Sequence, residues 1–326
     1  MIRKRFSCPT AVILFGFLSL TVSPPPADSG QNDTRLVLTL PDLSWALEIA
    51  EPGFTIKEKK FNDRVNGAML MAVNPTTQVN LSAFLEKAAK KGDAKACRDY
   101  YWERAKEAPT SMKDVRMFEK DQMAIVEYNI GTEKITQKNA HAYLAMGDYW
   151  IDVHLSQISF KPGTENSFSS ILEHIGINES YVPTAKEHFG YASYYYLKED
   201  YEKAAEHYEH VVDREKPETT LSRDIWRVAV DQLGMSYGLN GEPAKAKDVF
   251  EWAIPKDPEY PLFYYNLACA SAELGSPEEA LRNLRLAYQY KGNMLSGKSF
   301  PDPKKDPSFK KYLKDKHFRA ELDKMK

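Results

Sequence analysis

The chain has 326 residues and a formal net charge of −2 at pH 7. A length of this order indicates two domains rather than one. The nearly balanced charge excludes the broad basic field that nucleic-acid binding uses, so we expect no nucleic-acid partner.

Residues 1–27 have the pattern of an export signal. Three basic residues near the N-terminus precede an apolar run from Ala11 to Val22, and prolines follow at once. This run is shorter than the roughly 20 residues that span a membrane. We therefore expect cleavage near Ala27, export to the periplasm or the extracellular space, and no stable membrane span afterwards. An uncleaved N-terminal anchor is the alternative.

The first part of a predicted domain over residues 35–178 consists of short strands separated by turn residues. The expected strands are Leu36–Leu40, Trp45–Ala50, Phe54–Phe61 and Gly67–Val73. A short helix is one interpretation of Leu81–Ala89. Gly92 and Asp93 then indicate a break and an N-cap, which predicts a helix that runs to about Ala108.

The second part of this domain returns to alternating apolar and polar residues, the pattern of half-buried strands. Three such runs are Ala124–Ile130, Ala140–Met146 and Tyr149–Leu155, and Gly147-Asp148 predicts a hairpin between the last two. A closing helix is expected at Ser167–Ile175. The sum predicts an α+β domain, an antiparallel sheet with helices on one face. This order of elements resembles the PsbP-like fold.

Residues 179–184 are the expected linker, and a repeat follows it. From Arg227 to Met294 the sequence matches itself at a period of 34 residues. The matched pairs include Leu233 with Leu267, Gly241 with Gly275, Ala246 with Ala280, and Phe250 with Leu284. Small residues suit the crossing of two helices and glycine suits the turn. The pattern resembles the tetratricopeptide repeat (TPR).

This resemblance implies an all-α TPR solenoid over residues 185–326. A degenerate copy is expected at 185–218, and two clear copies at 227–260 and 261–294. Glu199 departs from the family, because it stands where the later copies have glycine. Capping helices over 306–325 would cover the open end of the solenoid, where an apolar face is otherwise exposed.

The resemblance also implies a binding surface, since the first helix of each TPR pair contacts the partner. The matching positions give the candidate groove residues Phe189, Tyr196, Val228, Asp231, Met235, Leu262, Tyr265 and Asn266. The Lys, Asn and Arg cluster of the chaperone-docking members is missing, with only Lys186 and Asn266 as similar groups. We expect a protein or an extended peptide in this groove, or else the protein's own N-terminal domain.

Catalytic and cofactor motifs are absent: the chain has no GxSxG elbow, no Walker loop and no GxGxxG. His207 and His210 lie near glutamates on one predicted helix, but too few ligands accompany them for zinc, and we expect them to face solvent. Cys97 and Cys269 are expected to be buried apolar residues. We therefore expect no enzyme, no metal and no cofactor.

The preferred hypothesis is thus an exported, non-catalytic protein whose repeats mediate protein–protein interaction. The alternative is an N-terminal domain that binds a small ligand or has enzymatic activity, with the repeats as a scaffold. Its support is the polar row Trp150, Asp152 and His154 beside His141. Ordinary cross-strand polar pairing would explain the same row.

Overall fold

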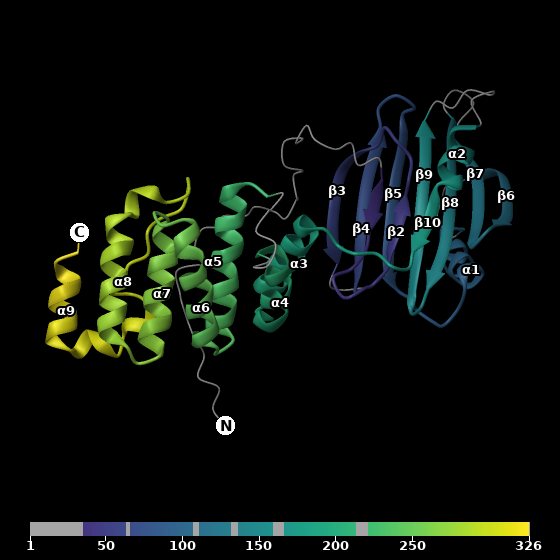
Figure 1. The fold of residues 1–326 in the computed structure, drawn as a ribbon. Coiled ribbons are helices and arrows are strands. Elements are labelled where there is room, and N and C mark those ends of the chain that lie inside the picture. The colour runs from purple at the N-terminus through teal and green to yellow at the C-terminus, as the bar shows by residue number, and fades with distance from the viewer. Residues whose placement is uncertain are drawn as a thin grey trace. The chain divides into compact units, whose positions relative to one another are not determined.

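The computed structural model describes residues 35–62, 66–106, 111–131, 136–158, 166–212 and 221–325 (Figure 1). These residues form two compact units, one that ends at Val182 and one that begins at Pro183. The export signal predicted for residues 1–27 lies outside the described residues. Among the helices of these ranges, none combines the length and the apolar character needed to cross a membrane.

The first unit contains a seven-stranded sheet in the order β3-β4-β5-β9-β8-β7-β6, with all neighbours antiparallel. The strands are β3 (Thr55–Asn62), β4 (Gly67–Asn74), β5 (Val79–Lys87), β6 (Met112–Lys120), β7 (Met123–Gly131), β8 (Thr136–Met146) and β9 (Tyr149–Ile158). The predicted hairpin joins β8 to β9, and Gly147 has a φ of 57° there. The helix interpretation of Leu81–Ala89 is wrong. That stretch lies largely in β5, where Leu81, Ala83 and Leu85 alternate toward the core.

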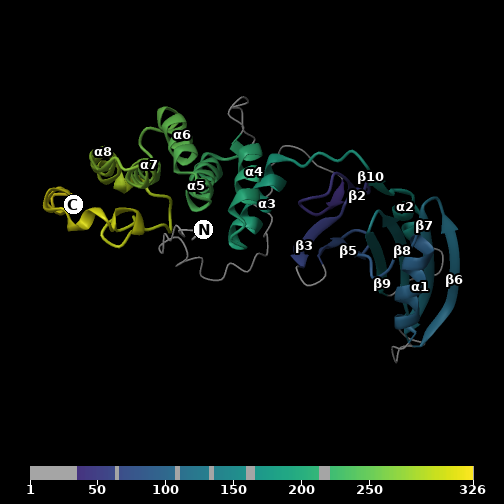
Figure 2. The ribbon, with the colours of Figure 1, turned by 90° about the horizontal axis from the view of Figure 1, so that it is seen from below.

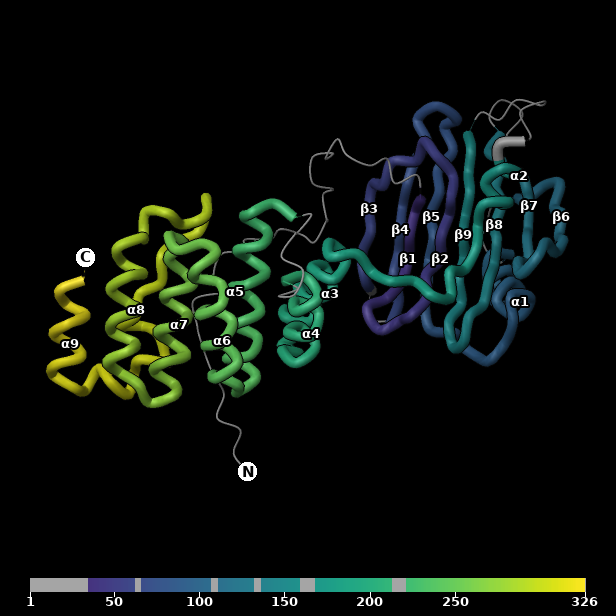
Figure 3. The backbone as a smooth tube through the Cα atoms, in the orientation of Figure 1, coloured from purple at the N-terminus to yellow at the C-terminus, as the bar shows by residue number. Residues whose placement is uncertain are grey.

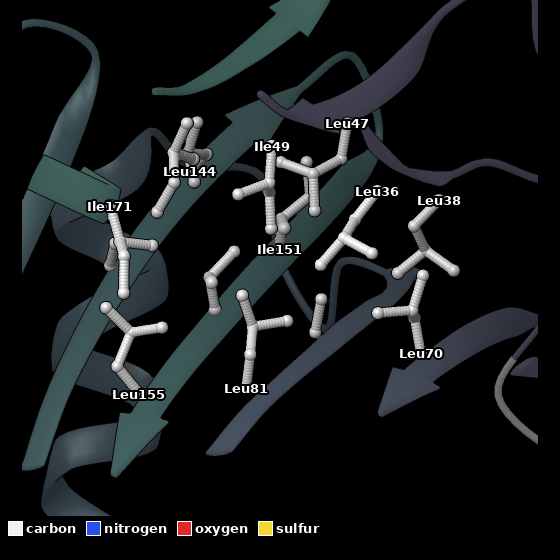
Figure 4. Packing of buried hydrophobic residues seen from close by; sticks show 14 of the residues in the cluster. Leu36, Leu38, Leu47, Ile49, Leu70, Leu81, Leu144, Ile151, Leu155 and Ile171 are labelled. Atoms are coloured by element: carbon white, nitrogen blue, oxygen red, sulfur yellow. The ribbon is translucent and has the colours of Figure 1, made fainter. Parts of the chain in front are cut away.

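One face of the large sheet is covered by a second, three-stranded sheet. Its strands are β1 (Leu36–Leu38), β2 (Ala46–Ile49) and β10 (Ile175–Asn178), and helix α2 (Asn166–Glu173) packs beside them. The core between the layers is aliphatic, with Leu47 and Ile49 facing Ile151 of β9 (Figure 4). This burial of leucine and isoleucine side chains is the main stabilising contribution in the unit.

The opposite face carries helix α1 (Ala94–Ala105). Asp93 caps this helix by accepting a hydrogen bond from the Ala96 N–H at 3.0 Å, as the sequence predicted. Cys97 and Trp102 of the helix pack against Trp150 and other apolar residues of β7 to β9. The sheet therefore has a second core on this face.

The predicted α+β domain with helices on one face is wrong, and with it the PsbP-like arrangement. The structure has a large sheet with a second sheet on one face and α1 on the other. The physical reason lies in the strands themselves. Near α1, Val126 and Trp150 are apolar on one face while Ile125 and Ile151 are apolar on the other, so both faces require cover.

The second unit consists of helical hairpins stacked side by side (Figure 3). The helices are α3 (Ala185–Leu197), α4 (Tyr201–Val212), α5 (Arg223–Leu239), α6 (Pro243–Ala253), α7 (Pro261–Glu273) and α8 (Pro277–Gln289). The second helices α6 and α8 begin 34 residues apart, at Pro243 and Pro277. The prediction of TPR-like helical repeats is confirmed.

The three helical hairpins share one turn geometry. Gly241 and Gly275 have φ angles of 85° and 84°, and Glu199 takes the same place with a φ of 60°. A side chain in this left-handed region is strained, which is why glycine is favoured there. The degenerate first copy therefore keeps the turn of the repeat without its usual residue.

A buried carboxylate ties α5 to the end of the second repeat. Asp257 is 1% exposed and accepts hydrogen bonds from Arg223 (Nη2, 2.6 Å) and Arg227 (Nε, 2.6 Å). Burial alone would raise the pKa of Asp257. The hydrogen bonds and charges of Arg227 and Arg223 outweigh burial, so this pKa lies below its ordinary value.

The expectation of an all-α solenoid through residue 326 is also wrong. After α8 the chain forms the short 3₁₀ turns η2 (Lys291–Asn293), η3 (Pro307–Phe309) and η4 (Tyr312–Lys314), and then helix α9 (Lys316–Asp323). No helix forms between Met294 and Asp306. Gly297, Pro301 and Pro303 explain this, because glycine and proline disfavour a continuous helix.

Candidate functional site

The first helices of the three hairpins, α3, α5 and α7, form one layer of the repeat unit (Figure 2). This layer carries the eight predicted groove residues: Phe189 and Tyr196 on α3, Val228, Asp231 and Met235 on α5, and Leu262, Tyr265 and Asn266 on α7. We call the surface made by these eight residues the first-helix surface. That these eight residues contact a partner stays a prediction. Their burial and their neighbours differ between α3, α5 and α7.

The α3 part of the surface is aromatic and partly open. Phe189 is half-buried with its ring edge-on to Tyr208, and the ring of Tyr196 is edge-on to Tyr201 at 5.4 Å. Leu197 follows at the end of the helix and is 60% exposed. This end of the first-helix surface therefore presents apolar side chains to solvent.

The α5 and α7 part contains a buried polar pair. The Asn266 side chain donates a hydrogen bond to the Asp231 carboxylate, and Asp231 is only 8% exposed. Burial raises the pKa of Asp231 to about 7, although the charge of Lys298 and the hydrogen bond from Asn266 act in the opposite direction. Asp231 therefore changes its charge near neutral pH.

A small cavity of about 50 Å³ lies between α5, α6 and α7. Gly234 and Phe250 are among its apolar lining residues, and Met235, Asn266 and Ser308 also line it. A volume of this order holds about one or two water molecules and no larger ligand. The cavity lies beside the first-helix surface, and Ser308 among its lining residues shows that the C-terminal segment reaches it.

Tyr265 is covered by the C-terminal segment and is only 1% exposed. Its hydroxyl donates a hydrogen bond to Asp306 Oδ2 at 2.9 Å, and its ring meets those of Phe300 and Phe309 edge-on at 5.7 and 6.1 Å. The Cys269 thiol donates to the same carboxylate oxygen at 3.6 Å. Tyr265 can therefore reach a partner only if this cover moves.

We call residues 295–309 the covering segment. It lies on the side of the repeat unit formed by the first helices (Figure 2). The cap predicted from the sequence begins only at residue 306, so the prediction leaves out the contacts of Leu295 and Phe300. In the sequence, Leu295 and Phe300 stand among glycine, proline, serine and charged residues without any helical or strand period. Such a pattern does not indicate which surface they contact.

Three histidines meet between α3 and α4. His188 Nδ1 lies 3.0 Å from His207 Nδ1, and the His188 ring stacks on His210 with centroids 4.3 Å apart. Burial lowers the pKa of His188 to about 4, and the neighbouring His210 and His207 contribute. The expectation that His207 faces solvent is wrong, because it is buried. Within the described ranges, no group of three or more His, Cys, Asp or Glu side chains could hold a metal ion.

The polar row on the large sheet forms a hydrogen-bonded chain. His141 Nδ1 lies 2.8 Å from Asp152 Oδ1, and the Tyr128 hydroxyl lies 3.3 Å from His141 Nε2. Burial raises the pKa of Tyr128, so its hydroxyl stays protonated and is a poor nucleophile at neutral pH. Trp150 is buried and donates instead to the Gly92 carbonyl at 3.2 Å. These hydrogen bonds join side chains of the neighbouring strands β7, β8 and β9. A ligand-binding or enzymatic role for the polar row stays a prediction.

No protein-family model matches the chain, and no curated protein does. Among solved structures it resembles the Yersinia enterocolitica secretion chaperone SycD in complex with a peptide of the translocator YopD, with 18% identity over 45% of this chain and 96% of that one, at a TM-score of 0.31. The TPR2B domain of yeast Sti1 in a pHsp70 complex is 16% identical over 44% of this chain and 98% of that one, at a TM-score of 0.30. A structure named MamA MSR-1 C2 is 19% identical at a TM-score of 0.29, and the match spans 34% of this chain and only 59% of that one.

These likenesses are too low to carry an argument about function. The assignment of the repeats depends on the chain's own geometry, which is the 34-residue spacing of α6 and α8 and the shared turn conformation at Glu199, Gly241 and Gly275. The described chain thus joins a two-sheet unit to TPR-like helical repeats.

Proposed function

We propose that this protein is a non-catalytic interaction protein whose repeats bind a protein partner along the first-helix surface. The observation that carries the proposal is the α3 end of this surface, where Tyr196 and Phe189 are only half-buried and Leu197 is 60% exposed. Apolar side chains on stacked helices suit the docking of an extended or helical segment of another protein. The eight predicted groove residues are the contacts we assign to that partner.

Site-specific cross-linking in the cells that produce the protein tests this surface. A photoreactive residue at Leu197 or Met235 should give a discrete cross-linked protein, identified by mass spectrometry. The matched control is Asp248, which is exposed on the second helix α6. Equal cross-linking at all three positions, or none at the first two, would contradict the proposal.

A double substitution provides the quantitative test. Tyr196→Ala with Leu197→Ser should reduce the cross-link at Met235 by about tenfold, since hot spots at interfaces are commonly aromatic. Leu197 is exposed, so its loss should change stability by no more than about 0.5 kcal/mol. An unchanged cross-link yield would remove α3 from the binding surface.

We propose further that the protein is exported. The support is the basic and apolar pattern of residues 1–27. Mass spectrometry of the mature N-terminus should find a chain that begins near Ala27. An intact Met1 on the protein isolated from its natural source would contradict cleavage and favour the uncleaved anchor, and recovery of the protein in the cytoplasmic fraction would contradict export.

A further inference from the structure

We propose that the covering segment, residues 295–309, is a built-in ligand of the first-helix surface, and that it shows the chemistry of the partner: an extended peptide with an aromatic residue and, six positions later, an acidic one. This inference rests on the proposed function and specifies which groups of the surface recognise the partner. It follows from two anchors within the segment, one aromatic and one acidic.

The aromatic anchor is Phe300. Its ring lies edge-on to Tyr265 of α7 at 5.7 Å and to Tyr288 of α8 at 4.9 Å. Edge-to-face contacts of this kind add to the gain from burying the ring. Phe300 itself is only half-buried, so part of its ring stays in contact with solvent.

The acidic anchor is Asp306, which is 1% exposed. The carboxylate accepts hydrogen bonds from the Tyr265 hydroxyl at 2.9 Å, the Cys269 thiol at 3.6 Å and the Ser308 backbone N–H at 3.0 Å. Tyr265 belongs to the first-helix surface, and Cys269 lies four residues further along α7. The Tyr265 hydroxyl and the Cys269 thiol, two neutral donors of α7, therefore hold this carboxylate.

Between the two anchors and Leu295 the chain is held loosely. Residues 296–299 are exposed, and the segment from Met294 to Asp306 forms no helix. Lys298 is close enough to Asp231 for its charge to oppose the rise of the Asp231 pKa, which links this stretch to α5. Asp306 and Phe309 are buried, whereas Leu295 and Phe300 are only partly buried, so the segment can open from residue 295 to its Phe300 anchor without unfolding the helices beneath it.

The covering segment differs in this respect from the end cap of the solenoid. The cap is formed by Phe318 and Leu322 of α9, which are buried together with Leu281 and Leu284 of α8 and with Phe309, the last residue of the covering segment. Changes at Lys298 and Phe300 therefore release the segment while the cap stays in place. A tethered segment competes at a high effective concentration, so a free peptide binds weakly until the segment is released.

The experiment uses the full-length chain and a fluorescent synthetic peptide of residues 294–310 as the probe. The release variant is Lys298→Glu with Phe300→Ser. The matched control is Lys305→Glu, which makes the same charge change at a side chain that is 76% exposed. Fluorescence anisotropy should show the release variant binding the peptide at least about tenfold more tightly than the wild type and the control.

Peptide variants then test the chemistry. Asp306→Asn or Phe300→Ala in the peptide should each weaken binding to the release variant by about tenfold, because each removes one anchor. Equal affinity of the wild type and the release variant for the peptide would overturn the proposal that the covering segment is a built-in ligand. Binding that is insensitive to both peptide changes would overturn the assigned chemistry.

Two further measurements separate release of the segment from unfolding, and failure of this inference from failure of the proposed function. If the double variant loses its helical circular dichroism, Phe300→Ser alone replaces it, and hydrogen exchange must show faster exchange at 296–300 than in α7. Cross-linking at Leu197 tests the proposed function separately. A cross-linked partner without peptide binding contradicts only this inference, whereas the absence of both contradicts the proposed function as well.

Discussion

The two units of the molecule bury different kinds of side chain. Among the described residues before Pro183, the buried polar residues are Thr39, Asn74 and Asn139, none of which ionises, and the core between the two sheets is aliphatic. The repeat unit buries the ionisable residues His207, Asp231, Asp257 and Asp306. Side chains of the first helices satisfy these carboxylates: Asn266 of α7 donates to Asp231, Arg223 and Arg227 of α5 donate to Asp257, and Tyr265 and Cys269 of α7 donate to Asp306. The repeat unit thus buries ionisable side chains among its apolar ones. Its free energy of unfolding should therefore depend on pH more strongly than that of the sheet unit.

The largest effect is expected from the aliphatic core. Ile151→Ala, at a side chain fully buried between the sheets, should lower the free energy of unfolding of the sheet unit by about 4 kcal/mol, equally at pH 5 and pH 8. Chemical unfolding followed by hydrogen exchange in each unit measures this. Ile158→Ala is the matched control, because Ile158 is 53% exposed and its loss should cost less than about 0.5 kcal/mol. Similar losses for both variants would contradict the two-layer core.

The next effect is the pH dependence of the repeat unit. Because the pKa of Asp231 is raised to about 7, the folded state keeps a proton that the unfolded state loses above about pH 4. Stability should therefore fall as the pH rises from about 4 to about 7 and then level off. Asp231→Asn keeps the acceptor for Asn266 without the charge, so at pH 8 it should be more stable than the wild type by roughly 3 kcal/mol.

Denaturant unfolding at pH 4 and pH 8 checks this prediction, with Asp248→Asn as the control at an exposed carboxylate. The gain of Asp231→Asn should be small at pH 4, where the folded carboxyl is protonated and the unfolded one is still about half protonated. A gain of the same size at both pH values would show that burial of the charge is not its cause.

The smallest effect concerns the crossing of α5 and α6. A Cβ added at Gly234 would lie 2.2 Å from Phe250 Cζ, so Gly234→Ala should destabilise the repeat unit by about 1–2 kcal/mol despite the better helix propensity of alanine. Gly190→Ala is the matched change on α3, where no atom lies within 4 Å of the added Cβ. It should stabilise by about 0.5–1 kcal/mol. Thermal unfolding that shows the same sign for both would contradict the close crossing.

The repeats were predictable from the sequence because a period places the same residue type at the same structural position. Gly241 and Gly275 mark one turn twice, and their φ angles agree within one degree. The hairpin at Gly147-Asp148 was predictable for a similar local reason. Glu199 shows the limit, since a non-glycine residue takes the same turn and weakens the sequence match of the first copy to the other two.

The layers of the sheet unit and the cover of Tyr265 were not predictable in this way. Alternation in β7 and β9 indicates which residues share a face, but it does not indicate what covers that face. Residues 295–305 have no period, so nothing local places Phe300 on Tyr265. The eight groove residues were inferred from family positions alone, and their different degrees of burial depend on this distant contact.

The covering segment also has a consequence for how the chain is made. It follows α8 in the sequence, so a ribosome completes α5 and α7 before the segment exists. During that interval the hydroxyl of Tyr265 and the thiol of Cys269 lack the Asp306 carboxylate that they contact in the finished chain. The burial of Tyr265 therefore has to wait until residues 295–309 have been made.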